Sequence, residues 1–274
     1  MAVHYPHMRS LPLLAAALTF ACSSQHQPVP SPATQHTLVA IFAHPDDETF
    51  VSPALAHYAR AGNRVYVIIA TDGRKGASQR FGVPAGDSLA AIRAGEARCS
   101  ARQLGAQPTI LLGFEDAGLA VLSPWPGEPL DRMSKLIDST LHVLRPDVVI
   151  TWGPEGGYGH QDHRLVGDVV TQVFQSGSVP AGTRLYYGGY PSDRAAAAQR
   201  AFGQRVYPTD AALLTTRIAY DAEDRAAARR ALSCHRSQES DEEMTRTFGV
   251  FEQLWNGEVA FQQWRGGPTS SKFF

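Results

Sequence analysis

From residue 37 onward, short apolar runs alternate with amphipathic runs, and this alternation constrains the fold more than any other feature of the chain. The apolar runs are rich in β-branched and aromatic residues and end in Gly, Asp, Pro or His, as strands usually do. Between them, apolar residues recur every three or four positions, which is typical of helices. The predicted strands are 37–43, 64–71, 109–114, 147–153 and 184–190, and the predicted helices lie within 52–62, 87–105, 130–145 and 163–175.

This pattern predicts an α/β protein with a Rossmann-like, mostly parallel sheet that carries helices on both faces. The first four strands are almost continuously apolar, as expected of strands that helices cover on both sides. Residues 221–255 predict two more helices with a break near 235–240, whereas 191–217 give no clear pattern. We find no internal repeat and no second domain, so residues 37–274 are predicted to form one domain.

Composition and motifs argue against binding to nucleic acid, a membrane-spanning helix and a dinucleotide-binding domain. The 274 residues carry a formal net charge of −1, which offers no basic surface for nucleic acid. No segment reaches the roughly 20 apolar residues that a membrane-spanning helix needs. No G-x-G-x-x-G fingerprint follows the first predicted strand, which disfavours a dinucleotide-binding domain.

The N-terminus has the layout of a bacterial export signal. Arg9 precedes an apolar stretch at 11–21, and small residues follow, so 1–22 are interpreted as a signal peptide and the Pro-rich residues 23–36 as a flexible tether. Cys22 lies where a lipoprotein signal would carry its lipid, although Thr19 and Phe20 depart from that pattern. We expect export to the periplasm or cell envelope, either free or membrane-attached through Cys22. The alternative is a disordered tail.

Cys99 and Cys234 are the remaining cysteines, and neither has the spacing of a metal-binding or redox pair. Each falls in a helical pattern, so we expect buried thiols. A single disulfide in an oxidising compartment is the alternative.

Charged residues crowd at the end of the first predicted strand, in "AHPDDE". His44 and Asp47 are three positions apart, so their side chains can converge, and Asp46 projects beside them. An imidazole and a carboxylate that converge at a strand end are suited to a divalent metal. The alternative is that one aspartate only caps the following helix. Glu48 is interpreted as structural.

A second cluster follows the fourth predicted strand, in "GHQDH", and supplies His160, Asp162 and His163. The alternative here is a glycine-rich loop with exposed histidines. Two separate His/Asp clusters at strand ends favour a metal site, because the carboxyl ends of parallel strands meet at one edge of the sheet. Three ligands from these clusters would leave an open coordination position, as catalytic zinc sites have.

The two motifs together resemble the PIG-L, or LmbE-like, de-N-acetylases, which include N-acetylglucosaminyl-phosphatidylinositol deacetylase. "AHPDDE" is followed about 115 residues later by "GHQDH", and "TDGRKGAS", "LLGFEDAGL" and "ALSCHRSQ" support the likeness, which covers about residues 37–240. His235 in the last stretch is expected to end a helix, or to lie on the rim of the site.

The resemblance implies roles for individual residues. His44, Asp47 and His163 would bind one zinc ion per chain, or another divalent metal such as Fe²⁺. Asp46 would be the general base that activates water. Tyr158 would reach the tetrahedral intermediate.

The resemblance also implies supporting roles. His160 would act as acid or help to hold the oxyanion, and Asp162 would orient it. Asp116 would contact sugar hydroxyls, and an arginine of the 74–80 segment, Arg74 or Arg80, would contact substrate. A solvated surface arginine is the alternative for that last role.

The sequence therefore predicts a zinc-dependent hydrolase that removes the acetyl group from an N-acetylated sugar or glycoconjugate. Two other interpretations remain: a metal hydrolase of the same fold that acts on another amide or ester, and an exported sugar-binding protein without activity. The expected partner is a small-molecule or glycan substrate, and the oligomeric state is not indicated.

Overall fold

The computed structural model describes residues 1–4, 34–76, 81–120, 127–203 and 205–274. The chain divides into the unit Met1–Thr34 and the unit Gln35–Phe274. Almost all of the expected export signal and tether, including Cys22, lies outside the described residues, and so does Arg80. The fold below is that of the second unit.

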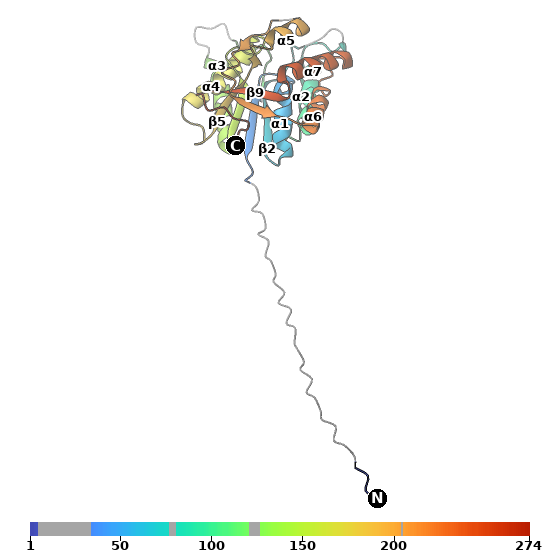
Figure 1. The fold of residues 1–274 in the computed structure, drawn as a ribbon. Coiled ribbons are helices and arrows are strands. Elements are labelled where there is room, and N and C mark those ends of the chain that lie inside the picture. Colours follow the sequence, from blue (N-terminus) through green and yellow to red (C-terminus); the bar gives the residue numbers. More distant parts are fainter. Residues whose placement is uncertain (5–33, 77–80, 121–126, 204) are drawn as a thin grey trace. The chain divides into compact units, whose positions relative to one another are not determined.

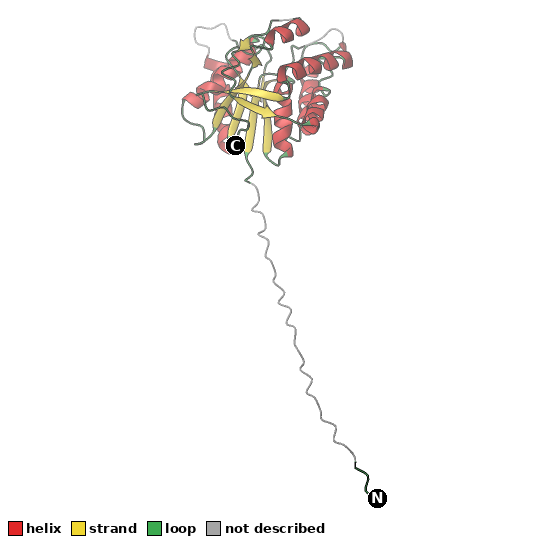
Figure 2. Ribbon diagram, in the orientation of Figure 1, coloured by secondary structure: helices red, strands yellow, loops and turns green. Residues whose placement is uncertain are grey.

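A seven-stranded sheet forms its centre, in the order β3-β2-β1-β4-β5-β9-β8 (Figures 1 and 2). The first five strands of that order are parallel, and β9 pairs antiparallel with both β5 and β8. The prediction of a mostly parallel sheet is confirmed. The strands are β1 (Thr37–Phe42), β2 (Arg64–Thr71), β3 (Ile110–Phe114), β4 (Val148–Trp152), β5 (Arg184–Gly188), β8 (Thr216–Ala219) and β9 (Glu258–Gln263).

Helices cover both faces of the sheet (Figure 1). Alternate residues of β1 belong to different cores: Leu38 packs with the helices of one face and Val39 with those of the other. This two-sided burial is why the strand sequences are continuously apolar. One face carries α3 (Gly127–Leu144) and α4 (Gln161–Gln175), and the other carries α1 (Ser52–Arg60), α2 (Asp87–Gln103), α6 (Ala222–Leu232) and α7 (Asp241–Trp255).

The two C-terminal helices begin where the sequence predicts. The side chain of Asp221 accepts backbone N–H groups at the start of α6, and that of Ser240 does the same for α7, each completing a capping box. The region 191–217, which gave no pattern, folds into short elements: α5 (Ala195–Phe202), β7 (Pro208–Thr209), which pairs with β6 (Tyr190–Pro191), and the start of β8.

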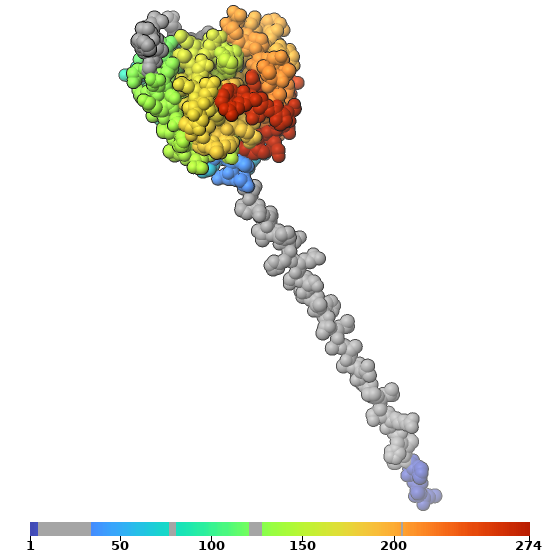
Figure 3. All heavy atoms as spheres, turned by 90° about the vertical axis from the view of Figure 1, so that its left-hand side faces the viewer, coloured from blue at the N-terminus to red at the C-terminus, as the bar shows by residue number. Residues whose placement is uncertain are grey.

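The C-terminal strand β9 lies between β5 and β8, and β8 ends the sheet on that side. In the space-filling view of Figure 3, C-terminal residues in red lie beside the yellow surface. Trp264, directly after β9, packs edge-on against Phe174 of α4 with ring centroids 6.1 Å apart. None of the described helices is long and apolar enough to cross a membrane.

Cys99 of α2 and Cys234, just after α6, form a disulfide. The expectation of two buried thiols is therefore wrong, and the alternative is correct. A helical pattern gives the face on which a cysteine lies but not the distance to another helix; the contact between α2 and α6 brings the two together.

The strand order brings the two His/Asp motifs to neighbouring strands. β1 and β4 are neighbours, although β2 and β3 come between them in the chain and pair on the far side of β1. At such a switch point, the loops after two adjacent strands leave in opposite directions and open a site for ligand. The short 3₁₀ helix η1 (Asp47–Val51) follows β1, and α4 follows β4.

Candidate metal centre and active site

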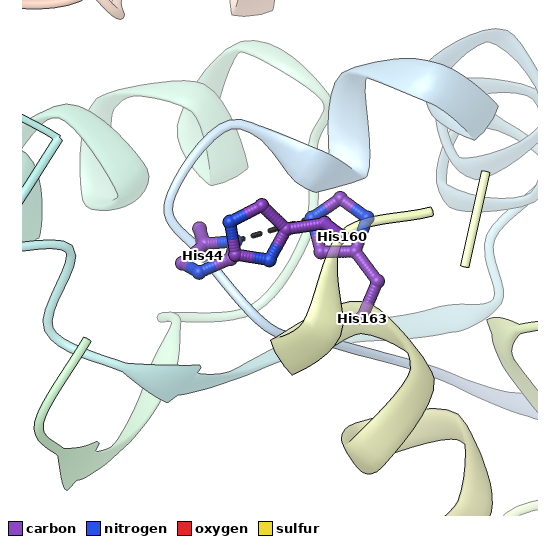
Figure 4. A group of neighbouring side chains, drawn as sticks. All are labelled: His44, His160 and His163. Carbon is purple, nitrogen blue, oxygen red and sulfur yellow. Dashed lines mark hydrogen bonds between the residues drawn. The ribbon is translucent and has the colours of Figure 1, made fainter. Parts of the chain in front are cut away.

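Two histidines from distant motifs face each other at this switch point. Nδ1 of His44 lies 3.2 Å from Nε2 of His163, and both side chains are buried. Figure 4 shows His163 and His160 projecting from the start of α4 toward His44 in the loop after β1. The two clusters that the sequence placed at strand ends therefore form one site.

The two ring nitrogens that face each other, His44 Nδ1 and His163 Nε2, are called the inner nitrogens, and the other two are the outer nitrogens. Each outer nitrogen lies beside a hydrogen-bond acceptor. Nε2 of His44 lies 3.3 Å from Asp116 Oδ1 and 3.4 Å from Asp162 Oδ2, and Nδ1 of His163 lies 3.2 Å from the carbonyl oxygen of Gly156. If these outer nitrogens donate, the two inner nitrogens both present lone pairs to the same point. Metal-binding histidines are commonly fixed in this way, because the outer hydrogen bond sets the tautomer and ring orientation.

Asp47 completes the group. Its Oδ1 lies 3.1 Å from Nε2 of His163, while its Oδ2 accepts the backbone N–H groups of Ala43 and His44 at 2.9 Å each. The indole N–H of Trp152 also donates to this Oδ2, at 3.1 Å. One carboxylate oxygen is thus held by three donors and lies 3.8 Å from His44 Nδ1, and the other oxygen faces His163.

The electrostatics of the group fit a cation. Burial lowers the pKa of His44, but hydrogen bonds to Asp116 and Asp162 and the nearby Asp47 outweigh it and raise that pKa to about 12. The surroundings thus strongly favour positive charge. Tetrahedral ligands bound at about 2.0 Å lie about 3.3 Å apart. The distances from His163 Nε2 to His44 Nδ1 and to Asp47 Oδ1, 3.2 and 3.1 Å, are close to that spacing. The residues present therefore fit a divalent metal ion.

His160 lies next to His44 and His163, but its hydrogen-bond partner is different. Its ring centroid lies 4.6 Å from that of His44 and 4.8 Å from that of His163, and the three histidines could together hold a metal ion. His160 is also the N-cap of α4, where its Nδ1 accepts the backbone N–H of Asp162 at 3.2 Å. Burial and the nearby imidazoles lower the pKa of His160.

The orientation of His160 differs from the expected one. Asp162 contacts it through its backbone N–H, whereas the Asp162 carboxylate faces His44 and accepts the backbone N–H of Ala117 at 2.9 Å. The physical reason is the helix cap, which points the Asp162 side chain away from His160. Tyr158 packs against the histidines, with its ring centroid 5.0 Å from that of His163.

Asp46 lies beside the group in an unusual backbone conformation. Its φ is 117° and its ψ −22°, a region that costs a residue with a side chain on the order of 1–3 kcal/mol. Its side chain is 33% exposed, whereas that of Asp47 is 6% exposed. Burial raises the pKa of the Asp46 carboxyl against the opposing charge of Arg93. The turn thus sends one aspartate into the buried group and the other toward solvent.

Arg93, which the sequence did not indicate, holds this turn. Its guanidinium donates to Asp46 Oδ2 at 2.9 Å, to the carbonyl of Pro45 at 2.6 Å and to that of Gly73 at 3.0 Å. A Cβ on Gly73 or Gly76 would lie 2.6 or 2.5 Å from Arg93 Nη1, which explains the two glycines of "TDGRKGAS". The available signal was three polar residues, Arg93, Glu96 and Ser100, at helical spacing on the buried face of α2.

The two residues expected to contact substrate, Asp116 and Arg74, do not line the cavity described below. Asp116 is buried behind His44, and its second carboxylate oxygen accepts the backbone N–H of Lys75 at 3.0 Å. Burial opposes ionisation of Asp116, but the contact with His44 lowers its pKa to about 2. Arg74 forms ion pairs with Asp72 at 2.7 Å and Asp87 at 3.1 Å, so the alternative of a surface arginine describes its position.

A cavity of about 230 Å³ opens beside the group. Asp46, Tyr158, His163, Tyr190 and Phe251 are among the residues that line it. A molecule in the cavity would thus lie within reach of Asp46 and His163.

His235 also borders the cavity, and it is buried. Its Nε2 lies 2.9 Å from Glu48 Oε1, so it is neither a simple helix end nor an exposed rim residue. Glu48 is fully enclosed and has a structural position, as the sequence suggested.

The fold and the site define a class: an α/β protein with a candidate mononuclear His/Asp metal centre at the switch point of a parallel sheet. The family model PIG-L, described as GlcNAc-PI de-N-acetylase, matches residues 39–174. Residues 39–174 therefore form a PIG-L family domain, as the motifs indicated.

Individual relatives agree with this assignment. A 1D-myo-inositol 2-acetamido-2-deoxy-alpha-D-glucopyranoside deacetylase of Rhodococcus jostii is 33% identical over 159 residues, which cover 52% of this chain and 54% of the relative. The chain thus spans about half the length of that curated relative.

Two solved structures share the fold. N,N'-diacetylchitobiose deacetylase from Pyrococcus horikoshii gives a TM-score of 0.60 at 19% identity, covering 83% of each chain. The A40926 pseudoaglycone deacetylase Dbv21 gives 0.61 at 19% identity, covering 85% of this chain and 98% of the other.

Proposed function

We propose that the protein is a zinc-dependent hydrolase that removes the acetyl group from an N-acetylated sugar or glycoconjugate. The observation that carries this proposal is that His163 Nε2 lies 3.2 Å from His44 Nδ1 and 3.1 Å from Asp47 Oδ1, and that Asp46, Asp47 and His163 line one cavity. The name of the Rhodococcus jostii relative, a deacetylase of an acetamido-sugar conjugate of inositol, supports the reaction class.

His44, Asp47 and His163 would hold the metal. Zinc would supply a Lewis acid that polarises the amide carbonyl and makes water a competent nucleophile near neutral pH. The preference for zinc over another divalent ion rests on the donor set, two imidazoles and one carboxylate, which zinc accepts readily.

The chain's own residues carry the proton transfers. The Asp46 carboxylate accepts a proton from the attacking water, and the partial exposure of its side chain leaves an oxygen accessible from the cavity. The Tyr158 hydroxyl, whose pKa burial raises, stays protonated and can donate to the oxyanion. His160 delivers a proton to the departing amine and recovers one from the Asp46 carboxyl, so that amide and water give acetate and a free amine and both side chains return to their starting state.

We also propose that the protein is exported, and attached to the membrane where Cys22 is lipidated. The support is the charged, apolar and small-residue pattern of 1–22, together with the Cys99–Cys234 disulfide, because disulfides persist mainly in oxidising compartments. Cell fractionation with labelled fatty acid tests both parts. A cytosolic protein would contradict export.

The reaction itself is tested by amine release. The purified full chain, loaded with zinc, is incubated with a panel of N-acetylated mono- and disaccharides and inositol conjugates. We expect a free amine and stoichiometric acetate from at least one of them. Hydrolysis of simple esters or non-sugar amides alone would favour the other metal hydrolase, and zinc-independent sugar binding without turnover would favour the inactive sugar-binding protein.

A further inference from the structure

A buried carboxylate ties the Asp46 turn to the rest of the domain. Oε2 of Glu48 accepts the backbone N–H of Asp46 at 3.1 Å. Oε1 of the same carboxylate accepts a hydrogen bond from the hydroxyl of Ser100 and lies 2.9 Å from Nε2 of His235. All three partner side chains, Glu48, Ser100 and His235, are at most 1% exposed. Because Asp46 has a strained conformation, its backbone needs such an external partner to keep it.

One face of α2 supplies much of this support. Arg93, Glu96 and Ser100 are three and four positions apart, so they lie in one stripe on the helix. Arg93 holds the Asp46 carboxylate and Ser100 donates to Glu48. Glu96 accepts the backbone N–H and the hydroxyl of Ser237 at 2.7 and 2.8 Å. The stripe therefore connects the turn to the segment that follows α6.

The disulfide joins the same two segments, α2 and the segment that follows α6, close to the contacts with Glu48. Cys99 is the neighbour of Ser100, and Cys234 is the neighbour of His235. The two groups that bond Glu48 Oε1 are thus each next to one half of the cross-link. His235 and Cys234 lie outside the part of the chain that the family model matches, 39–174, but within the "ALSCHRSQ" stretch noted above.

We propose that Glu48, His235 and the Cys99–Cys234 disulfide form a positioning clamp that holds the Asp46 turn, and so directs the Asp46 carboxylate at the metal centre. The proposal rests on the proposed function in one respect, the role of Asp46 as base. His235 fixes the Glu48 carboxylate, Glu48 fixes the Asp46 backbone, and the disulfide prevents the segment carrying His235 from moving away from α2. His235 and Glu48 act through Asp46 and are positioning residues.

A matched pair of variants at His235 tests the clamp in the zinc-loaded full chain. His235→Leu removes the donor to Glu48, whereas His235→Gln keeps an N–H at a similar reach. We expect His235→Leu to lower kcat about 10- to 100-fold with KM and zinc stoichiometry unchanged, because small displacements of a reacting group have effects of that size. We expect His235→Gln to recover most of kcat. Equal kcat for wild type and a folded His235→Leu overturns the proposal.

The disulfide is tested in parallel with Cys99→Ser/Cys234→Ser, with Ser233→Ala as control because Ser233 is exposed beside Cys234 and bonds only the carbonyl of Arg229. We expect a lower kcat for the double variant at a temperature where it is fully folded, and no change for the control. An unchanged kcat for the double variant removes the disulfide from the clamp and contradicts the proposal as stated. If His235→Leu does not fold, this variant decides.

Crystal structures separate this proposal from the proposed function. In His235→Leu or the cysteine double variant, we expect Asp46 to leave its positive φ, or its N–H to lose Glu48. An unchanged Asp46 turn in both overturns the clamp, whatever the activity. If wild type releases no amine from any N-acetylated sugar, the proposed function fails, and the same structures still decide whether the clamp exists.

Discussion

Nδ1 of His44 and Nε2 of His163 lie 3.2 Å apart, although 119 positions separate the two residues in the sequence. The outer nitrogens of both rings face acceptors, so the inner nitrogens are left to face each other. When both outer nitrogens donate, the inner nitrogens face each other with lone pairs, which repel, and a divalent cation bound by both would remove the repulsion. This relationship makes metal content the first property to measure.

Metal stoichiometry distinguishes the ligands from their neighbour. We expect His163→Ala and Asp47→Ala to lose tightly bound zinc, because each removes one of three converging donors. His160→Ala should keep it, since His160 already accepts a hydrogen bond from the Asp162 backbone as the cap of α4. Zinc analysis of the purified variants checks this. Full zinc content in Asp47→Ala, or its loss in His160→Ala, would make His160 the third ligand.

Trp152 should tune metal affinity without touching the metal. Its indole N–H donates to Asp47 Oδ2, and its ring stacks on His163 with centroids 4.6 Å apart and planes 3° from parallel. Trp152→Phe keeps an aromatic face and removes the donor, so we expect zinc affinity to fall roughly 10- to 100-fold. Competition with a chelator measures it. Affinity equal to wild type would show that the two backbone donors to Asp47 suffice.

The sequence predicted those parts of the molecule that depend on local pattern. The five parallel strands followed from apolar runs buried on both sides, and His44 and His163 from their positions at strand ends. It did not indicate Arg93, because a mid-helix arginine acquires its role only when α2 packs against the turn at Pro45. The cysteine pairing escaped for the same reason: it depends on the contact between α2 and α6.

Substitutions at Gly76 and Gly95 form a matched pair that tests how tightly the Arg93 guanidinium is packed. In Gly76→Ala the new Cβ would lie 2.5 Å from Arg93 Nη1 and 3.0 Å from Gln238 Oε1, so the guanidinium must move away from its carbonyl partners. We expect a loss of about 1–3 kcal/mol in the free energy of unfolding, together with lower kcat. Gly95→Ala, on the open side of α2, should instead stabilise by roughly 0.5–1 kcal/mol. Denaturant unfolding checks both; equal shifts would contradict the crowding at Gly76.

The disulfide should contribute strongly to stability. Cys99 and Cys234 are 135 positions apart, and cross-linking so long a loop restricts the unfolded chain. We expect Cys99→Ser/Cys234→Ser to lower the free energy of unfolding by about 2–5 kcal/mol in urea. Wild type unfolded with a phosphine reductant present should approach the double variant, and the double variant itself should not respond to the reductant. A wild-type midpoint in the double variant would show that the cross-link does not form in solution.

Asp46 should separate turnover from metal binding. Asp46→Asn keeps the size of the side chain and a residue type that tolerates positive φ, so the turn and the zinc site should persist. The amide cannot accept the proton of the attacking water, and we expect kcat to fall by about 10²- to 10⁴-fold. Zinc content measured on the same sample provides the control, with Asp72→Asn as a second carboxylate change in the ion pair with Arg74, outside the metal group. Hydrolysis at the wild-type rate in zinc-loaded Asp46→Asn would assign the base to another residue.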